Sequence, residues 1–160
     1  MSDGVEWALH SATVLAAVPP DRGLTAAKLA EFHGVPSAYL AKHLQALTRA
    51  GIFEAVPGRN GGYRLARPAA QISVLDVVDA VEGRLRPFLC SEIRQRGPVA
   101  GPKAEYRKAC GISRVMYEAE NAYRDVLKNT SLVDLISGLM VDAPDAAVRG
   151  ATWLQKELSS

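Results

Sequence analysis

The sequence is poor in cysteine and has no long apolar run. Its 160 residues include two cysteines, which are too few for a disulfide framework. No stretch of about 18 apolar residues occurs, so we expect neither a membrane span nor a membrane partner. No signal-peptide pattern occurs either, and we therefore predict a cytoplasmic protein. The sequence also lacks a Ser/His/Asp set, a phosphate-binding glycine loop and a paired-carboxylate site, which argues against an enzyme.

The charge is small overall but unevenly distributed. The formal net charge is +2, yet residues 20–67 contain seven Lys or Arg against three acidic residues. Residues 84–108 contain seven basic residues against two acidic ones. Two separate basic segments in a nearly neutral chain favour a polyanionic partner.

Residues 36–67 carry the strongest local pattern in the chain. Leu40, Leu44 and Leu47 fall at i, i+4 and i+7, which predicts an amphipathic helix that ends before Gly51. Two short β-prone runs, 52–56 and 63–65, follow, and the Asn-Gly turn between them predicts a hairpin. A polar-faced helix followed at once by a hairpin with a basic tip is typical of a winged helix-turn-helix. In that fold the helix enters the DNA major groove and the wing straddles the backbone.

The residues predicted to contact double-stranded DNA lie on the polar face of this helix and at the tip of the hairpin. The alternative is a solvated helix face beside an ordinary hairpin. The helix residues would make groove and phosphate contacts, and the tip residues would reach the neighbouring minor groove or backbone. The candidates on the helix are Ser37, Tyr39, Lys42 and Gln45, and those at the tip are Arg59 and Asn60.

Helical periodicity dominates the rest of the chain. It predicts helices at 4–18, 25–34, 72–83, 111–128, 132–140 and 145–158, around an irregular basic loop at 84–109. The helix at 111–128 keeps an unused apolar face, which predicts a homodimer interface. We therefore expect a mainly α fold in three parts. These are a winged helix-turn-helix domain with a two-stranded wing (1–83), the loop (84–110), and a long dimerisation helix with C-terminal helices (111–160).

Cys90 and Cys110 lie at the two ends of the irregular loop. Iron–sulfur clusters take thiolate ligands from loops of this kind, and basic side chains offset the charge of a thiolate-bound cluster. A [2Fe–2S] cluster needs four ligands, so two of them would have to be nitrogen or oxygen donors. Glu6 and His10 are spaced i, i+4 and could converge on one iron. The same four residues also fit two unrelated thiols and an exposed pair of helix side chains, and the spacing leaves both interpretations open.

Several segments resemble one known family, the IscR/NsrR-type iron–sulfur winged-helix regulators of bacteria. The resemblance covers roughly residues 4–140, and the wing with its Gly-Gly-Tyr is its most specific part. The segments are VEWALHSATVLAA, PSAYLAKHLQALTRAG, VPGRNGGYRLARP and ISVLDVVDAVEG. The resemblance implies a homodimer with a cluster between the DNA-binding part and the long dimerisation helix.

The number of cysteines distinguishes this chain within the family. Most members use three loop cysteines and one ligand from the N-terminal helix, whereas this chain has two cysteines. It is most similar to the RsrR-like redox-sensing branch, whose [2Fe–2S] cluster has two Cys, one His and one Glu ligand. This resemblance implies Glu6, His10, Cys90 and Cys110 as ligands in a cluster-binding loop at 84–110, with the Glu/His pair supplied by the partner subunit.

The predicted function is a redox-sensing transcription regulator that binds promoter DNA. Reduction would add negative charge at the cluster, and nearby side chains would have to respond. Trp7, adjacent to Glu6, and His33, in the turn of the helix-turn-helix, are the candidates for that response. Trp7 could equally be an ordinary core or interface aromatic. The alternatives for the whole protein are a cluster-free regulator gated by thiol chemistry or by a protein partner, and an iron–sulfur carrier.

Overall fold

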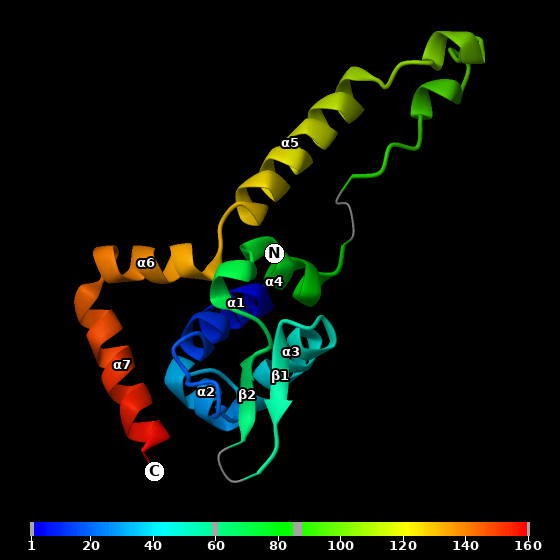
Figure 1. The fold of residues 1–160 in the computed structure, drawn as a ribbon. Coiled ribbons are helices and arrows are strands. Elements are labelled where there is room, and N and C mark those ends of the chain that lie inside the picture. The colour runs from blue at the N-terminus through cyan, green and yellow to red at the C-terminus, as the bar shows by residue number, and fades with distance from the viewer. Residues whose placement is uncertain (1, 59–60, 85–87, 160) are drawn as a thin grey trace. The chain divides into compact units, whose positions relative to one another are not determined.

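The computed structural model describes residues 2–58, 61–84 and 88–159 of the chain. It forms two compact units. The first comprises Met1–Arg84 and Leu127–Ser160 and contains the hydrophobic core, and the second is Leu85–Val126. Figure 1 shows the element order along the chain.

Three helices begin the first unit, and the second and third of them form the helix-turn-helix: α1 (Asp3–Leu15), α2 (Ala26–His33) and α3 (Ser37–Arg49). The Thr25 side chain caps α2 by accepting a hydrogen bond from the backbone N–H of Lys28 at 3.2 Å. Gly34 ends α2 with φ 66°, a left-handed conformation that glycine adopts at low cost. The helix predicted at residue 25, and the turn that leads into the next helix, are therefore confirmed.

The apolar stripe of α3 faces the core as its spacing predicts. Leu40, Leu44 and Leu47 are 0% exposed and pack with buried residues of the other two helices, such as Ala12 and Leu29. Burying one such leucine contributes roughly 1.5–3 kcal/mol to folding. The core therefore determines which face of α3 is left for solvent or a ligand.

The wing is an antiparallel pair, β1 (Phe53–Val56) and β2 (Gly62–Leu65), in which Phe53 pairs with Leu65. A backbone bridge from Leu24 to Tyr63 ties the wing to the segment before α2, with N···O distances of 3.0 and 2.7 Å. A Cβ at Gly62 would lie 2.3 Å from the Leu24 carbonyl carbon, so this glycine permits the close approach. The predicted hairpin is confirmed.

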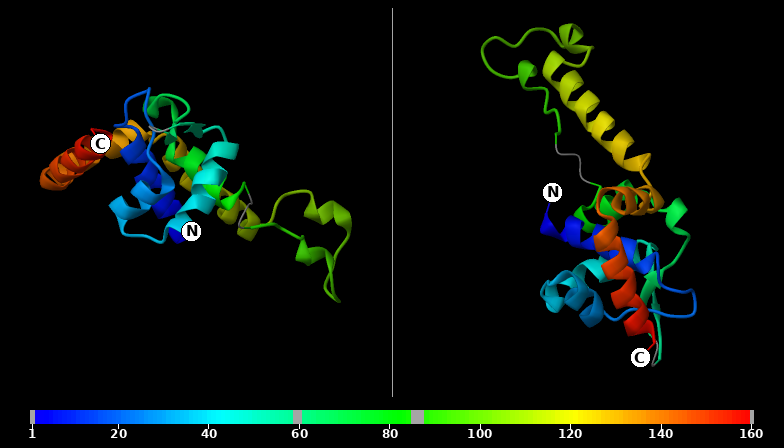
Figure 2. Two further views of the ribbon diagram at one scale, coloured as in Figure 1. Left: turned by 90° about the horizontal axis from the view of Figure 1, so that it is seen from below. Right: turned by 90° about the vertical axis from the view of Figure 1, so that its left-hand side faces the viewer.

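Three further helices complete the first unit: α4 (Val74–Glu82), α6 (Leu132–Asp142) and α7 (Pro144–Leu158), with a short 3₁₀ turn at Ala69–Gln71. Ser73 with Asp76, and Ser131 with Asp134, form complete capping boxes at the starts of α4 and α6. Helix α7 lies alongside α2 (Figure 2), where Phe32 and Trp153 pack edge to face with ring centroids 4.9 Å apart.

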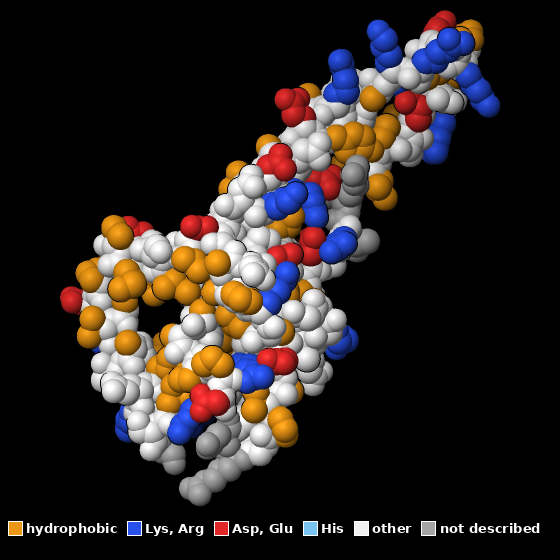
Figure 3. Space-filling view, viewed as in Figure 1, with side chains coloured by type: hydrophobic (Ala, Val, Ile, Leu, Met, Phe, Trp, Pro, Cys, Tyr) orange, Lys and Arg blue, Asp and Glu red, His pale blue; other side chains and the backbone are white. Residues whose placement is uncertain are grey.

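The second unit contains most of the long helix α5 (Gly111–Lys128) and the segment before it. That segment is less irregular than its sequence predicts, because it contains short 3₁₀ helices at Ile93–Gln95 and Lys103–Tyr106. Its Lys and Arg side chains are visible around its tip in Figure 3. Large apolar side chains of α5 are exposed, among them Ile112 (72%) and Val115 (64%). Within the described residues, no helix is both long and apolar enough to cross a membrane.

The fold class predicted from the sequence is confirmed. Among the described residues the chain has seven α-helices and a single two-stranded antiparallel sheet. The long helix at residues 111–128 is present with the predicted bounds. Its role in dimerisation is taken up below as a proposal.

Candidate DNA interface and metal-ligand residues

The outer face of α3 presents the polar side chains that the sequence predicts for DNA contact. Ser37, Lys42 and Gln45 are exposed, and Tyr39 is 67% exposed although it is a large aromatic. Pro36 precedes the helix as its N-cap residue, and its side chain has no acceptor for the free backbone N–H groups of the first turn. The predicted wing-tip residues Arg59 and Asn60 lie outside the described residues, and nothing is concluded about them.

Ion pairs within the protein account for several bases of the 20–67 segment. Arg64 pairs with Glu54 across the wing at 2.7 Å, and Arg67 pairs with Asp76 at 3.2 Å. Lys28 contacts both Glu31 and Glu157, whose hydrogen bonds raise its pKa above the ordinary value. Of the bases of this segment that the structure describes, Lys42 and Arg49 on α3 are exposed and have no acidic partner. Arg22 instead donates to the Leu158 carbonyl. The exposed bases without an acidic partner in this part of the described chain therefore lie on the predicted recognition helix.

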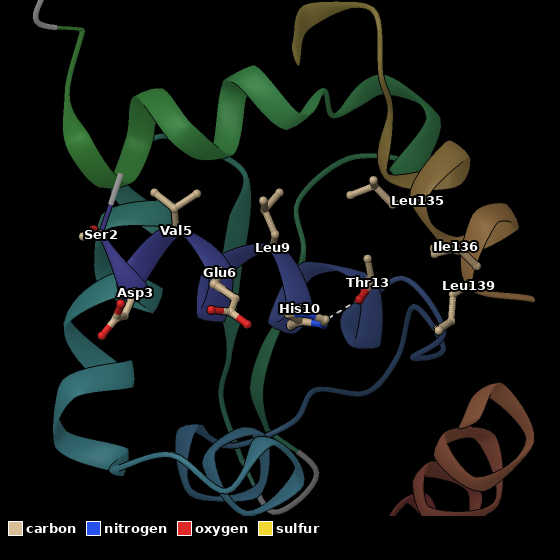
Figure 4. Close-up of a pocket in the computed structure, with 10 residues that line it drawn as sticks. All are labelled: Ser2, Asp3, Val5, Glu6, Leu9, His10, Thr13, Leu135, Ile136 and Leu139. Atoms are coloured by element: carbon tan, nitrogen blue, oxygen red, sulfur yellow. Dashed lines mark hydrogen bonds between the residues drawn. The ribbon is translucent and has the colours of Figure 1, made fainter. Parts of the chain in front are cut away.

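Glu6 and His10 project from the same side of α1, opposite to Val5 and Leu9, which point toward α4 (Figure 4). Both side chains are exposed, and both line a hollow of about 540 Å³ between α1 and α6. The α6 side of the hollow is apolar and consists of Leu135, Ile136 and Leu139. The predicted i, i+4 pair is thus accessible from outside the first unit, as a pair of metal ligands would have to be.

Two aromatic contacts connect α1 with the helix-turn-helix. The Trp7 ring meets the edge of His43 on α3 with centroids 6.2 Å apart, and His10 lies 5.7 Å from His33 at the end of α2. His43 also covers Gly4, where a Cβ would lie 2.2 Å from the imidazole Cε1. The predicted switch candidates Trp7 and His33 therefore both lie where α1 touches α2 and α3.

His33 has an unusual environment for a histidine. Its Nε2 is buried without a hydrogen-bond partner. Burial, and secondarily the charge of His10, lower the pKa of His33 from 6.5 to about 4. The imidazole is therefore neutral at pH 7 when no cluster is bound.

Cys110 occupies the N-cap position of α5. Its Sγ accepts a hydrogen bond from the Ser113 backbone N–H at 3.3 Å and lies 3.4 Å from Ser113 Oγ. Hydrogen bonding with the Ser113 side chain and backbone, and then the charge of Arg94, lower the pKa of the Cys110 thiol below its ordinary value. The structure thus favours the thiolate, which is both the nucleophilic form and the form that ligates metals.

Cys90 lies at the other end of the same loop, and its backbone N–H donates to the Tyr117 hydroxyl of α5 at 3.3 Å. Both cysteines are unpaired and half-buried, and both interact electrostatically with Arg94. The structure therefore places Cys90 and Cys110 in the second unit, whereas Glu6 and His10 belong to the first. Within a single copy, the described residues contain no group of three or more His, Cys, Asp or Glu that could hold a metal.

Three residues around these sites were not predicted from the sequence. Ser113 could have been found, because Cys-x-x-Ser at the start of an amphipathic helix has the spacing of an N-cap and its N3 partner. No local signal distinguishes Arg94 from the other loop bases, since its contacts depend on how the loop folds. The same holds for His43, whose partners lie about 40 positions earlier in the chain.

Comparisons with known proteins identify the family and the fold. The profile of the Rrf2 family, described as iron-dependent transcriptional regulators, matches residues 1–138. Protein aau3 of Rhizobium meliloti (strain 1021) is 38% identical over 109 residues, which are 68% of this chain and 67% of that protein.

Solved structures show the same fold. CymR (YrzC), the global cysteine regulator of B. subtilis, superposes with a TM-score of 0.64 at 23% identity, covering 86% of this chain and 95% of that one. IscR of T. potens gives a TM-score of 0.66 at 22% identity and covers 86% of each chain.

Proposed function

Because the chain belongs to the Rrf2 family of transcriptional regulators, we propose that it is a homodimeric redox sensor that binds promoter DNA under the control of a [2Fe–2S] cluster. Family membership confirms the resemblance noted from the sequence, and regulators of this family are not enzymes. The finer statements about the cluster, the redox signal and the dimer are our proposals. They rest chiefly on one observation, the two unpaired cysteines in one basic loop, where the Cys110 Sγ accepts a hydrogen bond from the Ser113 backbone N–H.

For DNA binding, the proposal uses the outer face of α3 as the reading surface. Lys42 would contact phosphate, and Gln45 would reach a base edge in the major groove. Ser37 and Tyr39 lie in the first turn of α3, where a recognition helix usually meets the bases. Arg59 and Asn60 remain candidates for the wing contact by their position in the sequence.

For the cluster, the donor chemistry fits. Two thiolates, one carboxylate and one imidazole supply the four ligands that a [2Fe–2S] cluster requires. The hydrogen bonds at Cys110 favour the ligating thiolate, and Glu6 and His10 are exposed on one helix face. When bound, such a cluster would accept and release one electron. In line with the family resemblance, we propose that a second copy of the chain supplies Glu6 and His10.

The chain's own residues would transmit the signal through the contacts of α1. Glu6 and His10 flank Trp7, which packs on His43 of the recognition helix, and His10 faces His33. A change in charge or position at Glu6 and His10 would therefore reach α3 through Trp7 and α2 through His33. The exposed apolar face of α5, including Ile112 and Val115, would be covered in the homodimer.

A cluster-free regulator gated by thiol chemistry is the second candidate. The observation that favours it is the lowered pKa of the Cys110 thiol at the start of α5, which would make Cys110 a reactive cysteine. Under this alternative Glu6 and His10 would have no metal to bind.

Purification without oxygen separates the two candidates. We expect red-brown protein with two irons and two sulfides for each Cys90–Cys110 pair. The colour should be lost in Cys90→Ala and in Glu6→Ala. The matched control is Glu31→Ala, which removes another exposed helix carboxylate and should leave the colour unchanged. Colourless protein under these conditions, or full colour in Cys90→Ala, would contradict the cluster proposal.

DNA binding is tested by its dependence on salt. Lys42→Ala should weaken binding at all sequences and reduce the slope of log K against log salt by about 1, as expected for one phosphate contact. Lys128→Ala, which changes an exposed lysine at the end of α5, is the control. Equal slopes for the two variants would place the interface elsewhere. Comparing oxidised with reduced protein on the same operator then measures the redox response.

A further inference from the structure

Arg94 is the most highly connected side chain of the loop that carries both cysteines. Its Nε and Nη2 donate to the two carboxylate oxygens of Glu92 at 2.5 and 2.8 Å. Nη2 also donates to the Lys108 carbonyl at 3.1 Å, and the guanidinium lies 5.2 Å from the centre of the Tyr106 ring. One side chain therefore joins a segment that begins two residues after Cys90 to one that ends two residues before Cys110.

The partner of Arg94 is held in an unfavourable backbone conformation. Glu92 has φ 49° and ψ 52°, and it is the only non-glycine residue with positive φ among the described residues. Such a conformation is unfavourable for an ordinary residue and persists where the surrounding structure enforces it. Here it accompanies a two-oxygen ion pair with Arg94, a geometry that the planar guanidinium can make and an ammonium group cannot.

A hydrogen bond between Gly101 and Tyr106 stabilises the part of the loop that leads to Cys110. The Tyr106 hydroxyl accepts a hydrogen bond from the Gly101 backbone N–H at 2.6 Å. Tyr106 is half-buried under the guanidinium, whereas most neighbouring side chains are exposed. Tyr106 thus provides a fixed ring against which the Arg94 guanidinium lies. Arg94 is held by this ring and by the Glu92 carboxylate.

The position of Arg94 relative to the thiols gives these contacts a consequence. Its contacts flank both cysteines, since the Glu92 carboxylate belongs to the residue two positions after Cys90 and the Lys108 carbonyl to the residue two positions before Cys110. Of the loop's bases, Arg107 is exposed and has no such set of contacts. A general role in solubility would not require two-oxygen pairing, a carbonyl contact and ring stacking at one residue.

We propose that Arg94 is a positioning residue that closes the 90–110 loop and holds the Cys90 and Cys110 thiols together beside a fixed positive charge. In so far as the thiols hold a cluster, this inference rests on the proposed function. The closure of the loop does not depend on that function, because both thiols and Arg94 belong to one unit of one chain. Arg94 has two separable effects. The two-oxygen pairing of its guanidinium with Glu92 fixes the loop, and its positive charge stabilises negative charge on the thiolates.

Cross-linking of the two thiols tests the closure in the full-length protein without metal. The protein is treated with excess short bifunctional maleimide, and mass spectrometry compares the intrachain cross-link with the product that carries two separate labels. This ratio reports how close the thiols are rather than how fast they react. We expect the ratio to fall about tenfold in Arg94→Gln, which corresponds to about 1.4 kcal/mol.

Two matched variants sharpen the test. Arg107→Gln removes the same charge from the same loop and should retain the wild-type ratio. Arg94→Lys keeps the positive charge but loses the two-oxygen pairing with Glu92, so its ratio should fall nearly as far as in Arg94→Gln. An unchanged ratio in both Arg94 variants, or an equal fall in Arg107→Gln, would overturn the proposal. Retained operator binding shows that the first unit of each variant is folded.

The reduction potential of red-brown protein tests the effect of the charge. Removal of a positive charge destabilises the more negative, reduced form, so Arg94→Gln should shift the potential to a more negative value. Arg94→Lys should shift it less, although it loosens the loop. Equal potentials for Arg94→Gln and Arg107→Gln would refute this part. Protein that is colourless in every preparation would refute the cluster proposal alone, because the cross-linking result would still decide the closure of the loop.

Discussion

The contact between Gly4 of α1 and His43 of α3 makes a quantitative prediction about a single methyl group. An ideal Cβ at Gly4 would lie 2.2, 2.6 and 2.8 Å from the Cε1, Nε2 and Nδ1 atoms of His43. Carbon atoms in contact are normally about 3.5–4.0 Å apart, so the imidazole must move in Gly4→Ala. Moving it disrupts the edge-to-face contact with Trp7, whose ring centroid is 6.2 Å away.

The expected magnitude follows from three contributions. Overpacking costs about 1–3 kcal/mol, and loss of an aromatic pair costs about 0.5–1.5 kcal/mol. Alanine is favoured over glycine in a helix by up to about 1 kcal/mol. We therefore expect Gly4→Ala to lower the free energy of unfolding by about 2 kcal/mol, within a range of roughly 0.5–3.5 kcal/mol. In a His43→Ala background the clash is absent, and the same substitution should be neutral or stabilising.

Urea unfolding of the wild type, Gly4→Ala, His43→Ala and the double variant gives the coupling energy between positions 4 and 43. Gly138→Ala is the matched control, because Gly138 lies within α6 and a Cβ there would meet nothing within 4 Å. We expect Gly138→Ala to stabilise the protein by up to about 1 kcal/mol. Additive effects of Gly4→Ala and His43→Ala, within about 0.5 kcal/mol, would refute the reasoning. They would also remove the basis for transmission from α1 to α3 through His43.

Two further predictions concern stability. Since burial lowers the pKa of His33 to about 4 from 6.5, the cluster-free protein should lose stability as pH falls from about 6.5 toward 4, and His33→Gln should flatten this dependence in urea unfolding. With about 1.4 kcal/mol per pKa unit, reduced because the side chain is only half-buried, the loss should be about 1–2 kcal/mol. Ser131→Ala removes the capping box of α6 and should cost about 1 kcal/mol, whereas Ser137→Ala on the exposed face of the same helix should cost little.

Each of these predictions has a clear contradictory result. Identical pH dependence in wild type and His33→Gln would mean that His33 does not remain neutral in the folded protein. Equal thermal midpoints for Ser131→Ala and Ser137→Ala would mean that the capping box does not contribute to the stability of α6.

Local sequence patterns determined the secondary structure because they act over short distances. The leucine stripe of α3, Thr25 before α2 and Ser73 before α4 each predict an element from residues within about two turns. The structure confirms all three. The same patterns showed that Cys90 and Cys110 belong to one loop, and the resemblance to a family suggested which helix residues would complete a ligand set. That ligand set, the dimer and the division into three parts remain predictions.

Tertiary structure alone decided which side chains meet. Arg94 and Arg107 are both arginines of the same loop. Arg94 binds Glu92 and the Lys108 carbonyl, whereas Arg107 is exposed. The seating of His43 on Gly4 likewise depends on the crossing of α1 and α3, because the two residues are far apart in the chain. Contacts of this kind arise from the packing of whole elements around a shared core, and no short segment of sequence encodes them.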